Sequence, residues 1–343
     1  MTLRPLLNLC LVAVLTPATL AQQSDAGSGP PRFIRVTSKA SLIHLGSLDS
    51  FDITESGIKA ADLLLHCLTD KRPEPAREAI EIYKRIIPNE NFGGEYTALE
   101  WICEFMVASK ADQQKMLADR VTAEWYKHLA QNDFEPLKYY LKSKYHLREW
   151  KDRKTPKSEA KFRFLEDFIL FNNPRRERWE QTSKMMEVLG LKKGDVVADL
   201  GSGPGYFTFK FANLVGDTGY VYAIDTNKQH LEYVARLVRE FGLKNVEAVE
   251  ATPKGYTLGK KVDLVYVCSL YHNIYALDTD EERGRFMSAI KDMLKPGGTL
   301  VLVDNGLVED KTLPYHGPHI AKELIINQLW YYGWRLVQTH QFI

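Results

Sequence analysis

Residues 196–207 read Val-Val-Ala-Asp-Leu-Gly-Ser-Gly-Pro-Gly-Tyr-Phe, and this stretch decides the fold. The opening apolar run is typical of a buried parallel strand, and Asp199 lies where that strand ends. Three glycines follow, and they form a loop in which the backbone turns tightly and approaches a ligand without Cβ clashes: Gly201, Gly203 and Gly205. The helix expected next points its N-terminal amide groups at the same place. The stretch therefore predicts a ligand-binding turn between a strand and a helix.

The chain after this turn predicts further strands that alternate with helices. Residues 219–225 (GYVYAID) form an apolar strand ending in Asp225, and an amphipathic helix is expected over 228–241. Later strands are expected at 246–251, 262–268 and 299–304, with a helix over 282–294 before the last of them. This alternation predicts the α/β class, a Rossmann-like doubly wound parallel sheet that binds its ligand at the carboxyl ends of the strands.

The glycine spacing is D-x-G-x-G-x-G, which differs from the G-x-G-x-x-G of dinucleotide enzymes. It resembles the first motif of class I S-adenosylmethionine-dependent methyltransferases, and the block LKPGGTLVLVDN at 294–305 also recurs in that family. The likeness covers about 175–343 and is strongest to UbiE-like enzymes. It implies S-adenosylmethionine as the cofactor, with its methionine part on the glycine loop, its ribose on Asp225 and its adenine bordered by 250–252. The implied cofactor-binding residues are Asp199, Gly201, Ser202, Gly203, Gly205, Asp225, Thr226, Glu250, Ala251 and Thr252.

A second motif follows the expected fourth strand, where UbiE-like relatives carry Tyr-His-His. Here Tyr271 and His272 are present, Asn273 replaces the second histidine, and Ser269 stands where relatives tend to have an acid. The resemblance implies that Tyr271 and His272 lie beside the transferred methyl group. His272 would then accept a proton from a hydroxyl, amine or thiol nucleophile. Packing of both residues against the cofactor is the alternative. The candidate catalytic residues are His272, Tyr271 and Tyr206.

Residues 1–21 have the features of a secretory signal peptide. Arg4 provides the positive start, 6–15 the apolar core, and 19–21 the small residues of a cleavage site. We therefore expect an exported protein, periplasmic or secreted, without stable membrane insertion after the signal is removed. A buried N-terminal helix, which would leave the protein cytoplasmic, is the alternative. Export conflicts with the cytoplasmic synthesis of S-adenosylmethionine, unless the segment is an uncleaved anchor or the cofactor is available outside.

The expected domain order is a flexible leader at 22–50, an all-α domain at 51–150, a charged linker at 151–161 and the methyltransferase domain at 162–343. The all-α assignment rests on apolar residues that recur at helical spacing, and a homodimer through this domain is one expectation. Its aromatic residues are expected to be mostly core. Cys67 and Cys103 lie on expected helices, and their pairing is left open. Arg175, Arg176 and Trp179 are candidates to border the active site, with surface pairing as the simpler interpretation for the arginines.

The balance of charged residues indicates which class of partner to expect. The chain has 45 Lys and Arg against 44 Asp and Glu, so no basic bias supports nucleic-acid binding. We expect a small-molecule acceptor. A protein or lipid-headgroup methyltransferase and a catalytically silent cofactor-binding scaffold are the alternatives. No metal site is expected, because neither an acid nor a cysteine completes a ligand set with His316 and His319. Relatives add a seventh strand, antiparallel between strands five and six, which nothing near residue 343 supplies, so a truncation or a rearranged sheet edge is expected.

Overall fold

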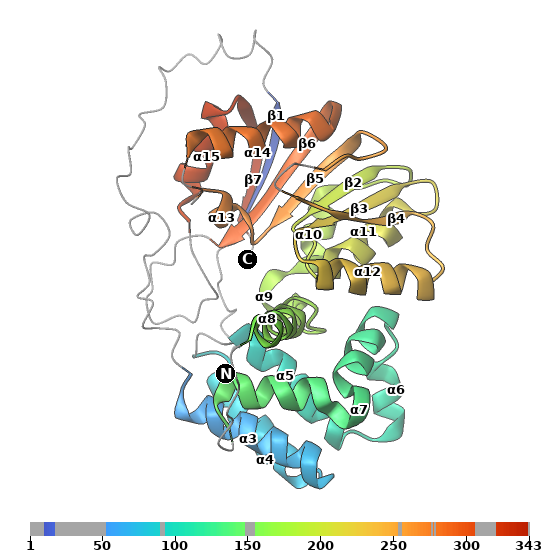
Figure 1. Ribbon diagram of the computed structural model, residues 1–343, viewed down its shortest axis with the longest axis vertical. Helices are drawn as coiled ribbons and strands as arrows, with labels where there is room; N and C mark the ends of the chain where they lie inside the picture. Colours follow the sequence, from blue (N-terminus) through green and yellow to red (C-terminus); the bar gives the residue numbers. More distant parts are fainter. Residues whose placement is uncertain are drawn as a thin grey trace. The chain divides into compact units, whose positions relative to one another are not determined.

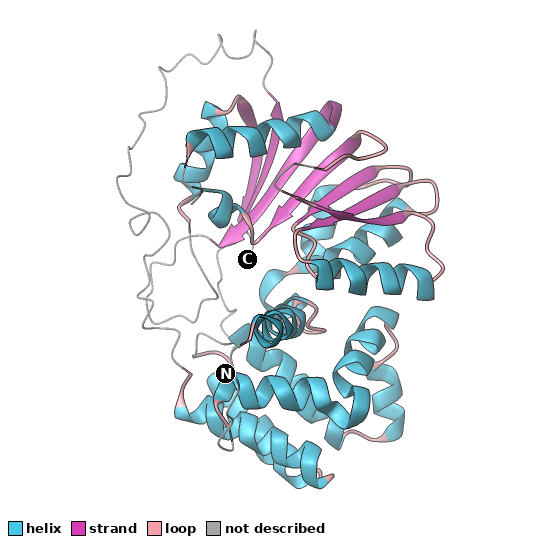
Figure 2. Cartoon of the chain, viewed as in Figure 1, coloured by secondary structure: helices cyan, strands magenta, loops and turns pink. Residues whose placement is uncertain are grey.

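The computed structural model describes residues 10–17, 53–89, 93–147, 155–252, 256–275, 277, 279–305 and 320–341. These residues fall into two compact units, shown in Figures 1 and 2. The helical unit lies within 49–182, and the sheet unit comprises the described parts of 7–48, 183–309 and 317–343. The leader at 22–50, the remainder of the expected signal segment, His316 and His319 lie outside the described residues.

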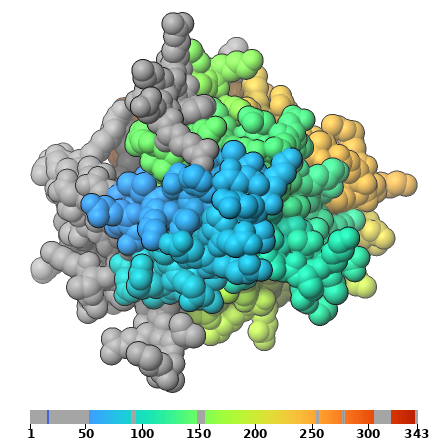
Figure 3. All heavy atoms as spheres, turned by 90° about the horizontal axis from the view of Figure 1, so that it is seen from below, coloured from blue at the N-terminus to red at the C-terminus, as the bar shows by residue number. Residues whose placement is uncertain are grey.

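The helical unit confirms the all-α expectation. Its elements are α3 (Glu55–Asp70), α4 (Glu74–Ile86), α5 (Gly93–Val107), α6 (Lys110–Met116), α7 (Arg120–Tyr145), α8 (Pro156–Phe171) and α9 (Glu177–Glu180). Side-chain caps start several of them: the Thr54 hydroxyl accepts from the Gly57 amide, and the Asp119 carboxylate accepts from the Thr122 amide. Figure 3 shows that α3 and α4, in blue, form much of the surface seen in that view.

Aromatic side chains fill the core of the helical unit, as their density predicts. Those that are fully or almost fully buried include Tyr83, Tyr96, Trp125, Tyr140, Tyr145 and Phe168. The indole N–H of Trp125 donates to the Phe168 carbonyl at 3.0 Å, which ties α7 to α8. Cys67 and Cys103 are buried free thiols, and burial raises the pKa of each. Neither thiol is therefore primed to react as a thiolate.

The boundary between the units lies at residues 182 and 183, where the sequence suggested 161 and 162. Helix α8 begins at Pro156, inside the expected linker, because Thr155 and Ser158 form a capping box. After it, Arg175 forms ion pairs with Glu100 and Glu104 of α5. These contacts hold the 156–182 segment to the helical unit. Arg176 forms an ion pair with Glu180 in the same segment. Both arginines are thus paired, as the simpler interpretation held, but their side chains are largely buried and do not pair at the surface.

The sheet unit is an α/β layer structure, as predicted. Its parallel strands are β2 (Val196–Leu200), β3 (Tyr220–Asp225), β4 (Val246–Glu250), β5 (Val262–Cys268) and β6 (Leu294–Asn305). Its helices are α10 (Thr182–Leu189), α11 (Tyr206–Val215), α12 (Lys228–Glu240), α13 (Tyr271–Tyr275), α14 (Asp280–Met293) and α15 (Lys322–Tyr331), and β7 (Trp334–Gln341) ends the sheet. The strand order is β4-β3-β2-β5-β6-β1-β7.

Strand β1 (Cys10–Pro17) comes from the part of the chain interpreted as the apolar core of a signal peptide. It lies between β6 and β7 and is antiparallel to both, with Val12 opposite Val303 on one side and His340 on the other. The expectation that nothing supplies this strand is wrong for the structure described here. An eight-residue apolar run fits a buried strand as well as a signal core, so periodicity alone did not separate the two.

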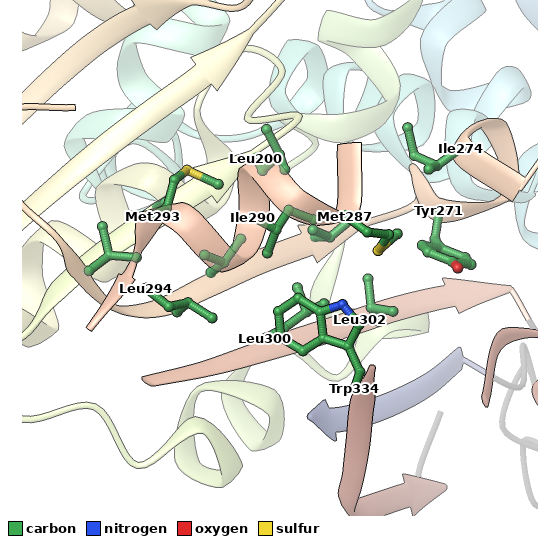
Figure 4. Packing of buried hydrophobic residues seen from close by; sticks show 14 of the residues in the cluster. Leu200, Tyr271, Ile274, Met287, Ile290, Met293, Leu294, Leu300, Leu302 and Trp334 are labelled. Atoms are coloured by element: carbon green, nitrogen blue, oxygen red, sulfur yellow. The ribbon is translucent and has the colours of Figure 1, made fainter. Parts of the chain in front are cut away.

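The main core of the sheet unit lies under α14 and α15. Met287 and Ile290 of α14 pack against Leu300 and Leu302 of β6 (Figure 4). Trp334 of β7 belongs to the same cluster. The cluster includes Val265 and Val267 of β5, both fully buried. Burying a Val, Leu, Ile or Met side chain stabilises a fold by about 1.5–3 kcal/mol relative to exposure. This cluster therefore fixes the ends of β5 and β6, where the candidate site lies.

Candidate functional site

The glycine loop begins where β2 ends, and its backbone conformation explains its composition. Gly201, Gly203 and Gly205 have φ values of +78°, +53° and +92°, in the region that favours glycine. A Cβ at Gly201 would lie 2.7 Å from Leu270, and one at Gly205 would lie 2.9 Å from both Phe209 and Val234. At Gly203, in contrast, nothing lies within 4 Å of such a Cβ. The middle of the loop therefore leaves room for a ligand to approach the backbone.

Asp225, at the end of β3, meets this open part of the loop. Its Oδ2 accepts from the Gly203 amide and its Oδ1 from the Asn227 amide, both at 2.8 Å. His230 of α12 is 5% exposed and places Nδ1 3.6 Å from Oδ2. Burial opposes the charged form, but His230 and the two amides outweigh it and lower the pKa of Asp225. Asp225 is therefore an ionised acceptor at neutral pH, as a ribose-binding carboxylate must be.

Two of the expected cofactor residues, one at the end of β2 and one in the loop, are instead buried. Asp199 is 3% exposed and accepts from the Thr208 hydroxyl of α11 at 2.6 Å. Ser202 is 8% exposed, and its amide donates to the Ile224 carbonyl of β3 at 3.1 Å. These contacts join the loop to α11 and β3. Asp199 therefore holds the loop in position, and any contact with a ligand would be in addition to that role.

The expected adenine border lies beside Asp225 at the end of β4. The Ala251 amide donates to the Asp225 carbonyl at 2.8 Å, which extends the pairing of β3 and β4 beyond the strands. Glu250 is paired with Lys228 at 3.4 Å, and Thr226 and Thr252 are exposed. The structure thus brings 250–252 next to Asp225, and their contact with adenine stays a prediction.

The second motif lies on the other side of the same sheet edge. Strand β2 pairs with β5, so the chain that leaves β5 passes the glycine loop, and Leu270 contacts Gly201. Ser269 has a φ of +51°, an uncommon value for a residue with a side chain. His272 follows on α13 and is bound to Asp304 at the end of β6: its backbone N–H donates to Oδ2, and Nδ1 lies 2.9 Å from Oδ1.

The other two catalytic candidates differ from His272. Tyr271 is fully buried beside Met287 and Leu302 (Figure 4), and its hydroxyl donates to Oε1 of Gln328 on α15 at 2.5 Å. Burial raises its pKa well above the ordinary value, so this hydroxyl stays protonated. We therefore assign Tyr271 to the core. Tyr206 is partly exposed at the first turn of α11, with the Lys210 ammonium 4.7 Å from its ring centroid.

Comparison with known proteins agrees with this geometry. Residues 191–332 match the family described as "Methyltransferase domain". The sheet unit contains a class I methyltransferase domain. Its cofactor is S-adenosylmethionine, and the open backbone at Gly203 beside the ionised Asp225 fits that ligand. No group of acidic, histidine or cysteine side chains suited to hold a metal occurs among the described residues of the methyltransferase or the helical unit.

Individual relatives match less than half of the chain. The ubiquinone/menaquinone biosynthesis C-methyltransferase UbiE of Klebsiella pneumoniae (strain ATCC 700721 / MGH 78578) is 29% identical over 147 residues, 42% of this chain and 55% of that protein. A tRNA U34 carboxymethyltransferase of Desulfotalea psychrophila is 32% identical over 135 residues, 38% of each chain. A solved SAM dependent methyltransferase from Aquifex aeolicus is 26% identical over a match that covers 46% of this chain and 80% of that chain, with a TM-score of 0.38. The chain spans about half the length of the UbiE relatives it matches.

Sequence reasoning missed two residues of the methyltransferase site, Asp304 and His230. Asp304 lies at the end of an apolar strand, which is the same signal that identifies Asp225. His230 lies on the buried face of α12, where a sequence gives no indication that an imidazole will reach the preceding strand end. Both act through a partner on another element, so the sequence can mark Asp304 as a candidate, but only the fold reveals the two pairings.

Proposed function

We propose that the methyltransferase domain transfers a methyl group from S-adenosylmethionine to a nucleophilic atom of a small molecule. The observation that carries the proposal is the hydrogen bond of 2.8 Å between the Gly203 amide and Asp225, at a place where a glycine Cβ position is open. A carboxylate and a bare backbone at adjoining strand ends suit ribose hydroxyls and an amino-acid moiety. A small-molecule acceptor is supported by the likeness to UbiE, which is named for ubiquinone/menaquinone biosynthesis.

The residues of this site act mainly by alignment. The cofactor supplies an activated methyl group when bound, so the protein needs to hold donor and acceptor in line, which contributes up to about 7–11 kcal/mol. Asp225 and the glycine loop would fix the donor. Tyr206 and His272 lie at the same strand ends and are the groups we propose on the acceptor side. His272 would hold or accept a proton there.

Calorimetric titration of the full chain with S-adenosylmethionine and S-adenosylhomocysteine tests the donor site. We expect micromolar binding of both, which Asp225→Ala abolishes, and no binding of NAD. Asp263→Asn is a matched control, because Asp263 also accepts from a backbone amide, that of Val196, at 2.8 Å but at the amino end of the sheet. NAD binding, or equal loss in both variants, would contradict the proposal. Binding of the two sulfur compounds without turnover on any acceptor would instead indicate a silent scaffold.

We also propose that residues 1–21 direct export, on the features of a signal peptide. The same residues contribute β1 to the sheet, so cleavage after Ala21 and a complete β1 exclude each other within one molecule. Among the described helices, none is long and apolar enough to cross a membrane. Mass spectrometry of the N-terminus, with protein taken from the cell and from the exported fraction, distinguishes the two fates. A homodimer through the helical unit remains a proposal, which light scattering tests directly.

A further inference from the structure

His272 is joined to a carboxylate from a different strand. Asp304 is 1% exposed and His272 is 7% exposed, so the pair is shielded from water. Oδ1 of Asp304 lies 2.9 Å from Nδ1 of the imidazole, and Oδ2 accepts a 2.9 Å hydrogen bond from the backbone N–H of His272. The same residue thus engages both carboxylate oxygens, which fixes the ring relative to its own backbone.

This arrangement decides where the imidazole carries its proton. An ionised carboxylate only accepts hydrogen bonds, so Nδ1 of the neutral ring must donate and Nε2 keeps the lone pair. A buried histidine that serves only to fill space has no need of a carboxylate at Nδ1, since a backbone carbonyl would satisfy the same N–H. The carboxylate also stabilises the ring once it is protonated, because a charge-assisted hydrogen bond is stronger than a neutral one.

We infer that Asp304 is a positioning residue that prepares Nε2 of His272 as a general base, and that the acceptor is a hydroxyl compound that arrives with its proton attached. The inference rests on the methyl transfer proposed above. A thiolate reaches the site already deprotonated and needs no base. A hydroxyl group holds its proton at neutral pH, and that proton has to leave during methylation.

The step balances in atoms and charge. The acceptor O–H bond breaks and the proton passes to Nε2 of His272, while the oxygen forms a bond to the methyl carbon. The S–CH₃ bond breaks with its electron pair on sulfur, and the sulfonium becomes the neutral thioether of S-adenosylhomocysteine. Positive charge therefore moves from sulfur to the imidazolium, where Asp304 offsets it at 2.9 Å.

Asp304→Asn separates the proton position from the packing. In this variant only one side-chain atom accepts, and the backbone N–H of His272 requires it. The amide NH₂ must then face Nδ1 and donate to it, so Nδ1 becomes the acceptor and the ring proton moves to Nε2. The variant thus keeps an imidazole in place while it removes the lone pair that would act as the base.

The tautomer is measured with ¹⁵N-labelled full-length protein and long-range ¹H–¹⁵N spectra of the histidine rings, with His272→Gln to assign the signal. We expect the Nδ1–H form in the wild type, the Nε2–H form in Asp304→Asn, and the wild-type signal in the control Asp263→Asn. An Nε2–H ring in the wild type, or an unchanged ring in Asp304→Asn, would overturn the inference. This result needs no acceptor.

Two further measurements separate this inference from the proposed function. Asp304→Asn should bind S-adenosylmethionine within about threefold of the wild type, because Asp304 lies on β6, which β5 separates from β2 and its glycine loop. If the wild type does not bind the cofactor, the proposed function fails, whatever the tautomer. With phenol and thiophenol as probes, methylation of phenol should fall about 10²–10⁴-fold in Asp304→Asn, and methylation of thiophenol should not. If the wild type methylates thiophenol but not phenol, the acceptor is not a hydroxyl compound. The inference is also contradicted if Asp304→Asn methylates phenol as fast as the wild type does.

Discussion

Ser269 is the strained residue of the second motif, and its substitution tests that strain. Its φ of +51° places a side chain in the left-handed region, which costs about 1–2 kcal/mol for a residue other than glycine. Part of the gain from glycine is lost through the greater freedom of the unfolded chain. Ser269→Gly should therefore raise the free energy of unfolding by about 0.5–1 kcal/mol in urea titrations. Ser269→Ala keeps the Cβ and loses the hydroxyl, so an equal gain in that variant would show that φ is not the cause.

Asp225 gives the site a pH dependence of defined sign. Its pKa is lowered in the folded chain, so the carboxylate stabilises the fold above its unfolded pKa of about 3.9, and this contribution is lost as pH falls through the folded value. Asp225→Asn should cost about 1.5–3 kcal/mol at pH 7, since it weakens charge-assisted hydrogen bonds. The difference in unfolding free energy between the two proteins should narrow below about pH 4. A gap that stays constant from pH 7 to pH 3 would refute this account of Asp225.

Substitutions in the glycine loop should have two different effects, one on folding stability and one on cofactor binding. A Cβ at Gly205 meets Phe209 and Val234 at 2.9 Å, whereas one at Gly203 meets nothing within 4 Å. Gly205→Ala should therefore lower stability by more than the roughly 1–2 kcal/mol that the backbone conformation alone costs. Gly203→Ala should cost only that amount, but it should weaken S-adenosylmethionine binding, because the methyl group takes the ligand's place. Thermal denaturation measures the stability of both variants, and calorimetry measures their affinity for S-adenosylmethionine. If Gly203→Ala binds the cofactor as tightly as the wild type, the cofactor does not bind at Gly203.

The sequence predicts those helices, strands and loops whose residue patterns lie within a short stretch of the chain. The glycine loop and strands β2 and β3 follow from apolar runs, strand-end acids and glycine chemistry within about thirty residues. The pairing of His272 with Asp304 was out of reach, because it depends on β5 and β6 being neighbours in the sheet. Helix α8 was missed in part because its charged first turn reads as a linker, while its capping box and the ion pairs of Arg175 hold it to the helical unit.

For the molecule as a whole, the position of β1 makes the sheet depend on the first residues of the chain. Val14 lies opposite Val301 of β6 and Gln338 of β7, so β1 pairs along both of its edges. Val14→Pro removes a backbone donor from a central strand and should destabilise the sheet unit by about 1–3 kcal/mol, the cost of leaving a buried carbonyl without its hydrogen bond. Removal of residues 1–21 should lower the melting temperature of the sheet unit further. If both the Val14→Pro variant and the protein without residues 1–21 melt at the wild-type temperature, β1 contributes nothing to the stability of the fold.

The distance along the chain between β1 and its neighbours also sets an order of events during synthesis. Val12 leaves the ribosome roughly 290 residues before its partner Val303, which at 5–20 residues per second is about 15–60 s. Throughout that interval the apolar segment lacks both of its partner strands, β6 and β7. Under the proposal that this segment directs export, translation speed would set a time limit within which it is either used for transport or incorporated beside β6. A slower ribosome would then favour export, and a faster one would favour the seven-stranded sheet.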